Sequence, residues 1–239
     1  MSALAARAIA KSFGGLKAVD NVTFAIDYGE LVGLIGPNGS GKTTLLNILS
    51  GHLAADAGEV LLDDRAIHHL TPVRAAHSGI LRMFQLTRVF RRMSTLDNLM
   101  AAGCALGLDF SAAQAKAHEL VDELQLARVA TLDAGHLSGG QQKLLEFGCC
   151  FMKPPKIALL DEPFAAVHPT MKEIMAGFIR RRHAAGQTFL IVSHDMPVIV
   201  ELCRRTVCMN AGVVLADGET RDVLVNRQVI EAYLGGEVA

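Results

Sequence analysis

The chain has 239 residues, of which 51% are apolar and 20% are charged, and 23 basic residues nearly balance 24 acidic ones for a net charge of -1. This composition excludes a generally disordered chain, a strongly basic nucleic-acid binder and an acidic tail protein. No window reaches the roughly 18 uninterrupted apolar residues of a membrane-spanning helix, and the opening residues lack the pattern of a signal peptide. At this length we expect one compact α/β domain with an inserted lobe.

The first fifth of the sequence predicts two strands, a buried strand and a helix. Alternating apolar and polar residues up to about Ile26 predict strands around a turn at Phe13-Gly14-Gly15. Residues 30–35 form an apolar run that ends in Gly-Pro-Asn-Gly, as expected where a buried strand meets a loop. Residues 42–50 then predict a helix that is closed by Gly51.

Between that strand and that helix lies a phosphate-binding pattern, G-x-x-x-x-G-K-[ST], at residues 36–43. Its glycines let backbone N–H groups turn toward phosphate oxygens, and the helix adds the positive end of its dipole. Lys42 is expected to reach the β- and γ-phosphates, and the Thr43 hydroxyl to ligate Mg²⁺. The sequence therefore predicts that the chain binds a nucleoside triphosphate. The expected contacts are Gly36, Pro37, Asn38, Gly39, Ser40, Gly41, Lys42, Thr43 and Thr44.

From about residue 87 to 135 the periodicity becomes helical, which predicts an inserted helical lobe. Ser111 and Gln114 have the spacing of a capping box at the start of one helix. Apolar residues on one face of that helix follow at Leu120, Val121 and Leu124.

After the lobe, strands and helices alternate, and this order predicts a largely parallel sheet with helices on both faces. The expected elements are strands at 157–160 and 189–192, helices at 169–184 and 197–204, and a hairpin with strands at 206–209 and 213–216.

Two adjacent acids, Asp161 and Glu162, follow the first of these strands. In parallel α/β sheets the carboxyl ends of the strands form the edge where ligands bind. Asp161 is expected to hold Mg²⁺, and Glu162 to polarise a water for attack on the γ-phosphate.

A second anion-receptive helix start lies at Leu137-Ser138-Gly139-Gly140-Gln141. Ser138 and Gln141 are spaced as a capping box, and the two glycines leave backbone N–H groups bare. A small-molecule kinase does not need this feature, and a GTPase is excluded because no guanine-reading N-K-x-D string occurs.

The string LSGGQ is the signature of ABC ATPases, and the chain resembles that family over residues 4–235. The resemblance implies an α/β P-loop NTPase fold, a RecA-like core with an antiparallel β subdomain and an inserted α-helical subdomain. It divides a single nucleotide-binding domain, 1–239, into a catalytic core at 1–86 and 154–239 and a helical subdomain at about 87–153.

The family's motifs assign roles to further residues, with ATP and Mg²⁺ as cofactors. By resemblance, Phe13 stacks on adenine, Gln85 senses Mg²⁺ and the membrane subunit, and His194 contacts the γ-phosphate. Glu162, His194 and Lys42 form the catalytic set, and Thr43, Gln85 and Asp161 the metal set. Because two such domains pack head to tail, the signature residues Leu137, Ser138, Gly139, Gly140 and Gln141 act on the ATP of a partner chain.

Local strings narrow the resemblance to one group within the family. Residues 12–19, 82–85 and 232–235 are similar to the ATPase subunits of branched-chain amino acid importers, a group that includes urea and short-amide importers. Residues 90–93 and 161–164 also resemble the ATPase of lipopolysaccharide export. Two other hypotheses are a soluble ABC ATPase without a transport role and an ATP-binding scaffold that does not hydrolyse ATP.

The resemblance implies several partners and a location. The partners are integral membrane permease subunits, an identical or sister ATPase that completes a dimer, and indirectly a periplasmic or extracellular substrate-binding protein; nucleic acid is not expected. The location is peripheral, at the cytoplasmic face of the inner membrane. Apolar residues that could line a groove for the permease are Phe84, Leu86, Val89, Phe90 and Met93, although about half of them are expected to belong instead to the core of the lobe.

Three residues depart from the family pattern. Cys149 and Cys150 stand in the signature helix where relatives have an Arg-Ala pair, and His168 stands where Asp or Asn is common. An arginine lost from a part-buried site removes a charge-assisted hydrogen bond of about 1–3 kcal/mol. A histidine ordinarily titrates near pH 6.5, so His168 is expected to make dimer assembly sensitive to pH. The five cysteines lack metal-ligand spacing and are expected to be reduced thiols.

Overall fold

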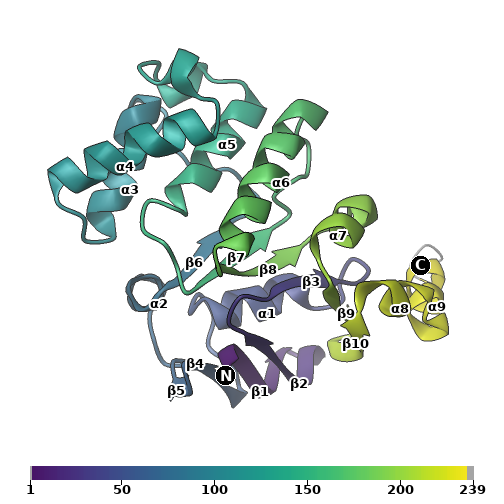
Figure 1. The fold of residues 1–239 in the computed structure, drawn as a ribbon. Coiled ribbons are helices and arrows are strands. Elements are labelled where there is room, and N and C mark those ends of the chain that lie inside the picture. Colours follow the sequence, from purple (N-terminus) through teal and green to yellow (C-terminus); the bar gives the residue numbers. More distant parts are fainter. Residues whose placement is uncertain (1, 236–239) are drawn as a thin grey trace.

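The computed structural model describes residues 2–235, in which a helical lobe stands on an α/β core (Figure 1). In chain order the elements are β1 (Ser2–Phe13), β2 (Leu16–Asp27), β3 (Leu31–Ile35), α1 (Lys42–Leu49), β4 (Ala57–Leu62), β5 (Arg65–Ala66), α2 (Pro72–Ser78), β6 (Ile80–Met83), α3 (Thr95–Ala105), α4 (Phe110–Glu123), the 3₁₀ turns η1 (Ala127–Val129) and η2 (Ala134–His136), α5 (Gly139–Cys149), β7 (Ile157–Asp161), α6 (Pro169–Ala184), β8 (Thr188–Val192), α7 (Met196–Leu202), β9 (Arg205–Asn210), β10 (Val213–Glu219), α8 (Thr220–Val225) and α9 (Arg227–Gly235).

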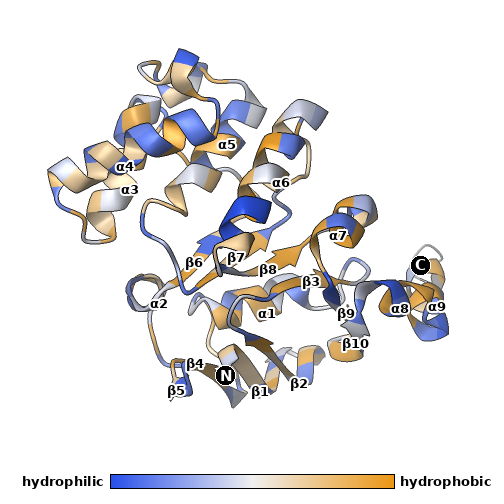
Figure 2. Cartoon of the chain, in the orientation of Figure 1, coloured by the Kyte–Doolittle hydropathy of each residue, from blue (hydrophilic) through white to orange (hydrophobic). Residues whose placement is uncertain are grey.

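The larger sheet has the strand order β10-β9-β3-β8-β7-β6. All its neighbouring pairs are parallel except β9 with β10, which confirms the prediction of a largely parallel sheet. Successive residues of a strand face opposite sides of the sheet. In β3, Val32 and Leu34 accordingly join one buried cluster, and Leu31 and Ile35 the other. Strands β7 and β8 appear as orange arrows, and the helices have mixed colours (Figure 2).

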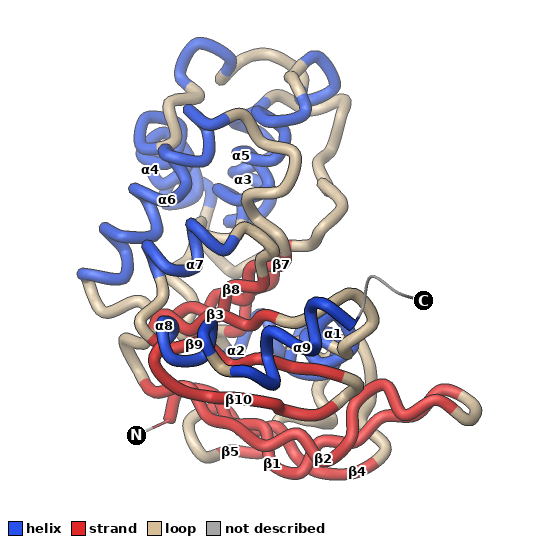
Figure 3. The backbone as a smooth tube through the Cα atoms, turned by 90° about the vertical axis from the view of Figure 1, so that its right-hand side faces the viewer, coloured by secondary structure: helices blue, strands red, loops and turns tan. Residues whose placement is uncertain are grey.

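The smaller sheet is antiparallel, with the order β2-β1-β4-β5, and lies at the bottom of the molecule in Figure 3. One side of helix α1 is buried in a hydrophobic cluster that also contains residues of both sheets. The helix contributes Leu45, Leu46, Ile48 and Leu49, the smaller sheet contributes Val22 and Phe24, and the larger sheet contributes Val32 and Leu34. This packing fixes the start of α1, and so the end of the phosphate loop, against the parallel sheet.

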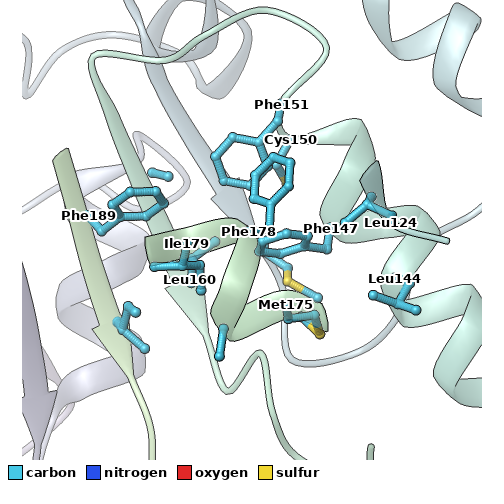
Figure 4. Packing of buried hydrophobic residues seen from close by; sticks show 14 of the residues in the cluster. Leu124, Leu144, Phe147, Cys150, Phe151, Leu160, Met175, Phe178, Ile179 and Phe189 are labelled. Atoms are coloured by element: carbon cyan, nitrogen blue, oxygen red, sulfur yellow. The ribbon is translucent and has the colours of Figure 1, made fainter. Parts of the chain in front are cut away.

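The helical lobe joins the core through an aromatic cluster (Figure 4). Phe147 from α5 lies 5.2 Å, centroid to centroid, from Phe178 of α6, and Phe151 lies 4.9 Å from both rings. Phe151 also reaches Phe189 of β8 at 6.1 Å. Such rings bury large apolar areas, so the signature helix is connected to the sheet by a continuous apolar core.

Most predicted elements are confirmed, including the helix at 169–184, but the capping box at Ser111 and Gln114 is wrong. Helix α4 begins at Phe110, and the carboxylate of Asp109 accepts the backbone N–H of Ala112 at 2.8 Å. Asp caps a helix as well as Ser does and here starts the helix two residues earlier, which adds helical hydrogen bonds. None of the helices within residues 2–235 is long and apolar enough to cross a membrane.

Candidate nucleotide site

Four neighbouring parallel strands bring the predicted site residues to one edge of the sheet. Strand β3 ends at the phosphate loop, β8 precedes His194, β7 ends at Asp161, and β6 ends two residues before Gln85. A cleft of about 680 Å³ lies at this edge. The predicted residues that line it are Phe13, Asn38, Gly39, Ser40, Gly41, Lys42, Thr43, Thr44, Gln85, Asp161, Glu162 and His194.

The phosphate loop depends on glycine at its tightest points. Gly41 has φ 102°, and a Cβ there would lie 2.3 Å from the carbonyl oxygen of Ala18. Lys42 is only 7% exposed, and its Nζ donates to the carbonyl oxygens of Gly36 at 2.7 Å and Pro37 at 2.8 Å. Burial lowers the pKa of Lys42, and the nearby Glu162 carboxylate opposes that shift. Gly36 and Pro37 thus hold the Lys42 side chain through their carbonyl oxygens. Although both were predicted to contact the nucleotide, neither lines the cleft.

Glu162 directly follows β7, His194 lies two residues after β8, and their side chains approach each other. Glu162 Oε1 is 3.5 Å from His194 Nε2, and the backbone N–H of His194 donates to Glu162 Oε2 at 3.4 Å. Glu162 is 8% exposed, and burial raises the pKa of its carboxyl. Its φ of 50° lies in the left-handed region, which costs a non-glycine residue conformational energy. The arrangement places a carboxyl of raised pKa and an imidazole at one wall of the cleft.

Mg²⁺ prefers oxygen ligands, and the residues predicted to hold it satisfy that requirement. The Thr43 hydroxyl, the Gln85 amide and the Asp161 carboxylate all belong to residues that line the cleft. Residues 2–235 contain no group of three or more His, Cys, Asp or Glu side chains that could hold a metal. This donor set suits Mg²⁺, which is ordinarily bound through one or two carboxylates together with substrate phosphates.

The signature residues lie outside the cleft, at the start of α5. Ser138 caps this helix in a complete capping box with Gln141, as predicted. Leu137 is buried, whereas Ser138 and Gly139 are exposed. A Cβ built on Gly139 meets nothing within 4 Å, so open space faces the bare N–H groups of this helix start.

The predicted docking residues do not form a single exposed groove. Leu86 and Phe90 are 79% and 63% exposed, but Val89 packs against the large core cluster and Met93 is half-buried. Phe84 is half-buried, and its ring lies between the guanidinium groups of Arg82, at 4.8 Å, and Arg88, at 3.9 Å.

The three departures from the family pattern have ordinary structural roles. Cys149 Sγ donates to the carbonyl oxygen of Asn98 at 3.8 Å, and Cys150 is buried. Burial raises the pKa of Cys149 to about 12, so this thiol stays protonated. His168 is the N-cap of α6, with Nδ1 accepting the N–H of Thr170 at 3.3 Å. All five cysteines are unpaired.

Two residues that support the site were not predicted from the sequence as site residues. Lys143, buried in α5, donates from Nζ to the carbonyl oxygens of Glu162 at 2.7 Å and Ala165 at 3.1 Å. The Tyr233 hydroxyl accepts the N–H of Gly36 at 2.7 Å, across 197 residues of sequence. For Lys143 the only local signal was a charged residue among the apolar positions of a helix. The sequence around Lys143 and Tyr233 does not indicate which residues they contact.

Comparison with known proteins agrees with this geometry. The model of the ABC transporter family matches residues 19–165, more than half of the chain. The chain belongs to the ABC transporter family. Its cassette is therefore a nucleotide-binding ATPase of the ABC type, and ABC ATPase subunits of transport systems dimerise and work with membrane permease subunits.

The relatives and solved structures cover nearly the whole chain. A probable branched-chain amino acid transport ATP-binding protein, LivG of Archaeoglobus fulgidus, is 33% identical over 99% of this chain and 97% of that protein. The high-affinity LivG of Escherichia coli K12 is 36% identical over 93% of this chain and 94% of that protein. The ADP conformation of MJ1267, an ATP-binding cassette of an ABC transporter, superposes with a TM-score of 0.87 at 32% identity, covering 98% and 99% of the two chains.

Proposed function

We propose that this chain is the ATP-hydrolysing subunit of an importer for branched-chain amino acids or related small polar solutes. The observation that carries the proposal is similarity to branched-chain amino acid transport ATP-binding proteins over nearly the full length of both chains. In support, most of the predicted nucleotide-binding residues, together with Asp161, Glu162 and His194, line one cleft, and the signature residues lie outside it at the start of α5.

Within this proposal each side chain has a defined task. The amide groups of residues 38–43 and the Lys42 ammonium bind the phosphates, and Phe13, half exposed at the rim, stacks on adenine. Thr43, Asp161 and Gln85 would hold Mg²⁺, which would neutralise charge on the phosphates when bound. Lys42 thus has to exchange its carbonyl partners for phosphate oxygens.

Hydrolysis proceeds by in-line attack of water on the γ-phosphate, which breaks the bond between the γ-phosphorus and the bridging oxygen and releases ADP and phosphate. Glu162 accepts a proton from that water, and its buried position, which raises the pKa of its carboxyl, makes it a stronger base than an exposed carboxylate. His194, whose Nε2 lies 3.5 Å from Glu162 Oε1, orients the carboxylate and contacts the γ-phosphate. Positioning and electrostatic stabilisation provide most of the acceleration.

The active assembly requires partners. Two cassettes, either identical or sister chains, pack head to tail so that the exposed start of α5 on one chain faces the nucleotide of the other. The permease docks near the exposed Leu86 and Phe90 at the cytoplasmic face of the inner membrane, and a periplasmic or extracellular substrate-binding protein delivers the solute to it.

ATPase activity of the chain, co-purified with its membrane partners in nanodiscs, tests the proposal. Substrate-binding protein loaded with leucine should stimulate phosphate release above the level seen with the empty protein. Stimulation by urea-loaded protein instead identifies an amide importer. A permease that has no substrate-binding partner and gives no stimulation contradicts import and favours lipid export.

A further inference from the structure

A buried arginine, Arg82, connects three parts of the nucleotide site. It is the third residue of β6, and its side chain is 4% exposed. Nη2 lies 3.0 Å from Asp161 Oδ2 at the end of β7, and Nη1 donates to Asn47 Oδ1 of α1 at 2.5 Å and to Ser50 Oγ at 3.3 Å. One guanidinium therefore joins the proposed metal-binding acid to the helix that follows the phosphate loop.

The same guanidinium also contacts the segment that leads into Gln85. Arg82 Cζ lies 4.8 Å from the ring centroid of Phe84, the residue directly before Gln85. Arg88 approaches this ring at 3.9 Å, and His52 meets it edge-on at 5.1 Å. A cation near an aromatic ring is attracted by its quadrupole, more strongly when both are shielded from water.

Burying the charges of Arg82 and Asp161 costs hydration free energy, so the ion pair is better explained by the orientation that it imposes than by the stability that it adds. A buried ion pair contributes little net stability compared with apolar residues of the same volume, because both charges lose their hydration. The planar guanidinium, however, presents its donors in fixed directions and so fixes the groups that accept from them. Asp161 is 2% exposed and lines the cleft, so the direction of its carboxylate is set by its neighbours rather than by solvent.

We propose that Arg82 is a positioning residue that holds the Asp161 carboxylate in its orientation at the cleft and ties Phe84, and thus the entry to Gln85, to the same strand edge. This inference rests on the proposed role of Asp161 as a metal-binding acid. It assigns to one side chain the alignment of two metal-set residues, Asp161 at the end of β7 and Gln85 two residues after β6.

A Mg²⁺ titration tests the first half of the proposal. Binding of a fluorescent ATP analogue is followed as Mg²⁺ is added to the wild type, Arg82→Met and Arg82→Lys. The Mg²⁺ concentration at half-maximal effect should rise about tenfold in Arg82→Met, the size expected when a charge-assisted contact is lost. Arg82→Lys keeps a cation beside Asp161, should show a smaller rise, and serves as the test if Arg82→Met does not fold.

Two results would overturn this half. An unchanged Mg²⁺ midpoint together with a lower unfolding temperature means that Arg82 only supports the fold. A lower midpoint means that the guanidinium competes with the metal for Asp161 instead of orienting it. Analogue binding without Mg²⁺ should stay within about twofold in all three proteins, since Arg82 does not line the cleft.

Hydrogen–deuterium exchange of nucleotide-free protein tests the second half. The peptide that covers residues 84–90 should exchange faster in Arg82→Met than in the wild type. Arg88→Met is the matched control, because Arg88 stacks on the same ring, whereas the ion pair with Asp161 is made by Arg82. It should speed exchange without moving the Mg²⁺ midpoint; equal midpoint shifts in both variants would contradict the proposal.

The two arms also separate this inference from the proposed function. If the wild-type chain binds no ATP analogue, both the proposed function and the proposed alignment of Asp161 are refuted. The exchange measurement needs no nucleotide and would still decide whether Arg82 holds the segment before Gln85.

Discussion

Two glycine-rich helix starts in this molecule, at α1 and at α5, have different surroundings. Both offer the positive end of a helix and bare N–H groups to an anion. The start of α1 lies in the cleft, with Lys42 buried beside it and Asp161, Glu162 and His194 around the same space. The start of α5 has its own capping box, but Ser138 and Gly139 face solvent.

The comparison shows that a helix start is only part of an anion site. At α1 the chain itself supplies the cation, the acids and the walls. At α5 it supplies only the backbone donors, as expected if the remaining groups come from a second cassette. Five variants test this difference, beginning with the largest expected effect.

Glu162, in the cleft at the start of α1, should determine the rate of ATP hydrolysis but not the affinity for Mg-ATP. Glu162→Gln should lower ATP hydrolysis about 10³-fold, within the range for loss of a general base, while Mg-ATP affinity stays within about twofold. Phosphate release and nucleotide binding measure the two quantities. Because burial raises the pKa of Glu162, wild-type turnover should fall on acidification at a higher pH than an ordinary carboxyl would give. Near-normal turnover in the variant would exclude Glu162 as the base.

The lysine at the same helix start should control binding. Lys42→Ala removes the buried ammonium and should weaken ATP affinity about 100-fold, equivalent to about 3 kcal/mol of charge-assisted hydrogen bonding. Isothermal titration calorimetry measures the affinity, and Lys153→Ala, at an exposed lysine, is the control. Unchanged affinity in Lys42→Ala would contradict the assignment of the phosphate loop.

The buried face of α5 carries a carboxyl whose ionisation is unfavourable. Burial raises the pKa of Glu146 from 4.5 to about 7, and its Oε2 has no hydrogen-bond partner. The folded chain therefore binds more protons than the unfolded chain between these values, so stability falls as pH rises from about 4.5 to 7. Glu146→Gln should add about 2 kcal/mol of unfolding free energy at pH 8 and nothing near pH 4.5. Urea unfolding at both pH values measures this, and an equal gain at both would refute the shifted pKa.

The exposed start of α5 should matter only in the assembled protein. Gly139→Ala places a methyl group in open space, so the unfolding temperature and the nucleotide affinity of the single chain should not change. Turnover of the assembled transporter should fall about tenfold, because the methyl group displaces the partner's nucleotide by a fraction of an ångström. Gly140→Ala is unsuitable as a test, since its Cβ would lie 2.4 Å from Met171 Sδ. Full turnover in Gly139→Ala would place this helix start away from the interface.

The smallest expected effect concerns support of the phosphate loop from the C-terminal helix. Tyr233→Phe removes the hydroxyl that accepts the N–H of Gly36 and should weaken ATP affinity about fivefold, equivalent to about 1 kcal/mol. Tyr28→Phe is the matched control, because Tyr28 bonds to Asp63, which does not line the cleft. Equal affinities for Tyr233→Phe and the wild type would show that the loop holds its shape without this contact.

The sequence predicted the elements of the fold and the strand ends that carry the site. Apolar periodicity predicted the helix at 169–184 with its observed bounds, and the run at residues 30–35 predicted the strand before the phosphate loop. It failed at the start of α4, where Asp109 and Ser111 are both suitable caps and the choice depends on which one gives the longer helix.

What the sequence by itself determined was local: glycine at tight turns, apolar residues with a regular period, and acids directly after buried strands. The tertiary structure alone decided which side chains complete the site. Arg82 reaches Asp161 across 79 residues, Lys143 reaches Glu162 across 19, and Tyr233 reaches Gly36 across 197. These partners depend on the order in which strands pair and on the face that each helix buries, and both are set by packing of the whole chain rather than by neighbouring residues.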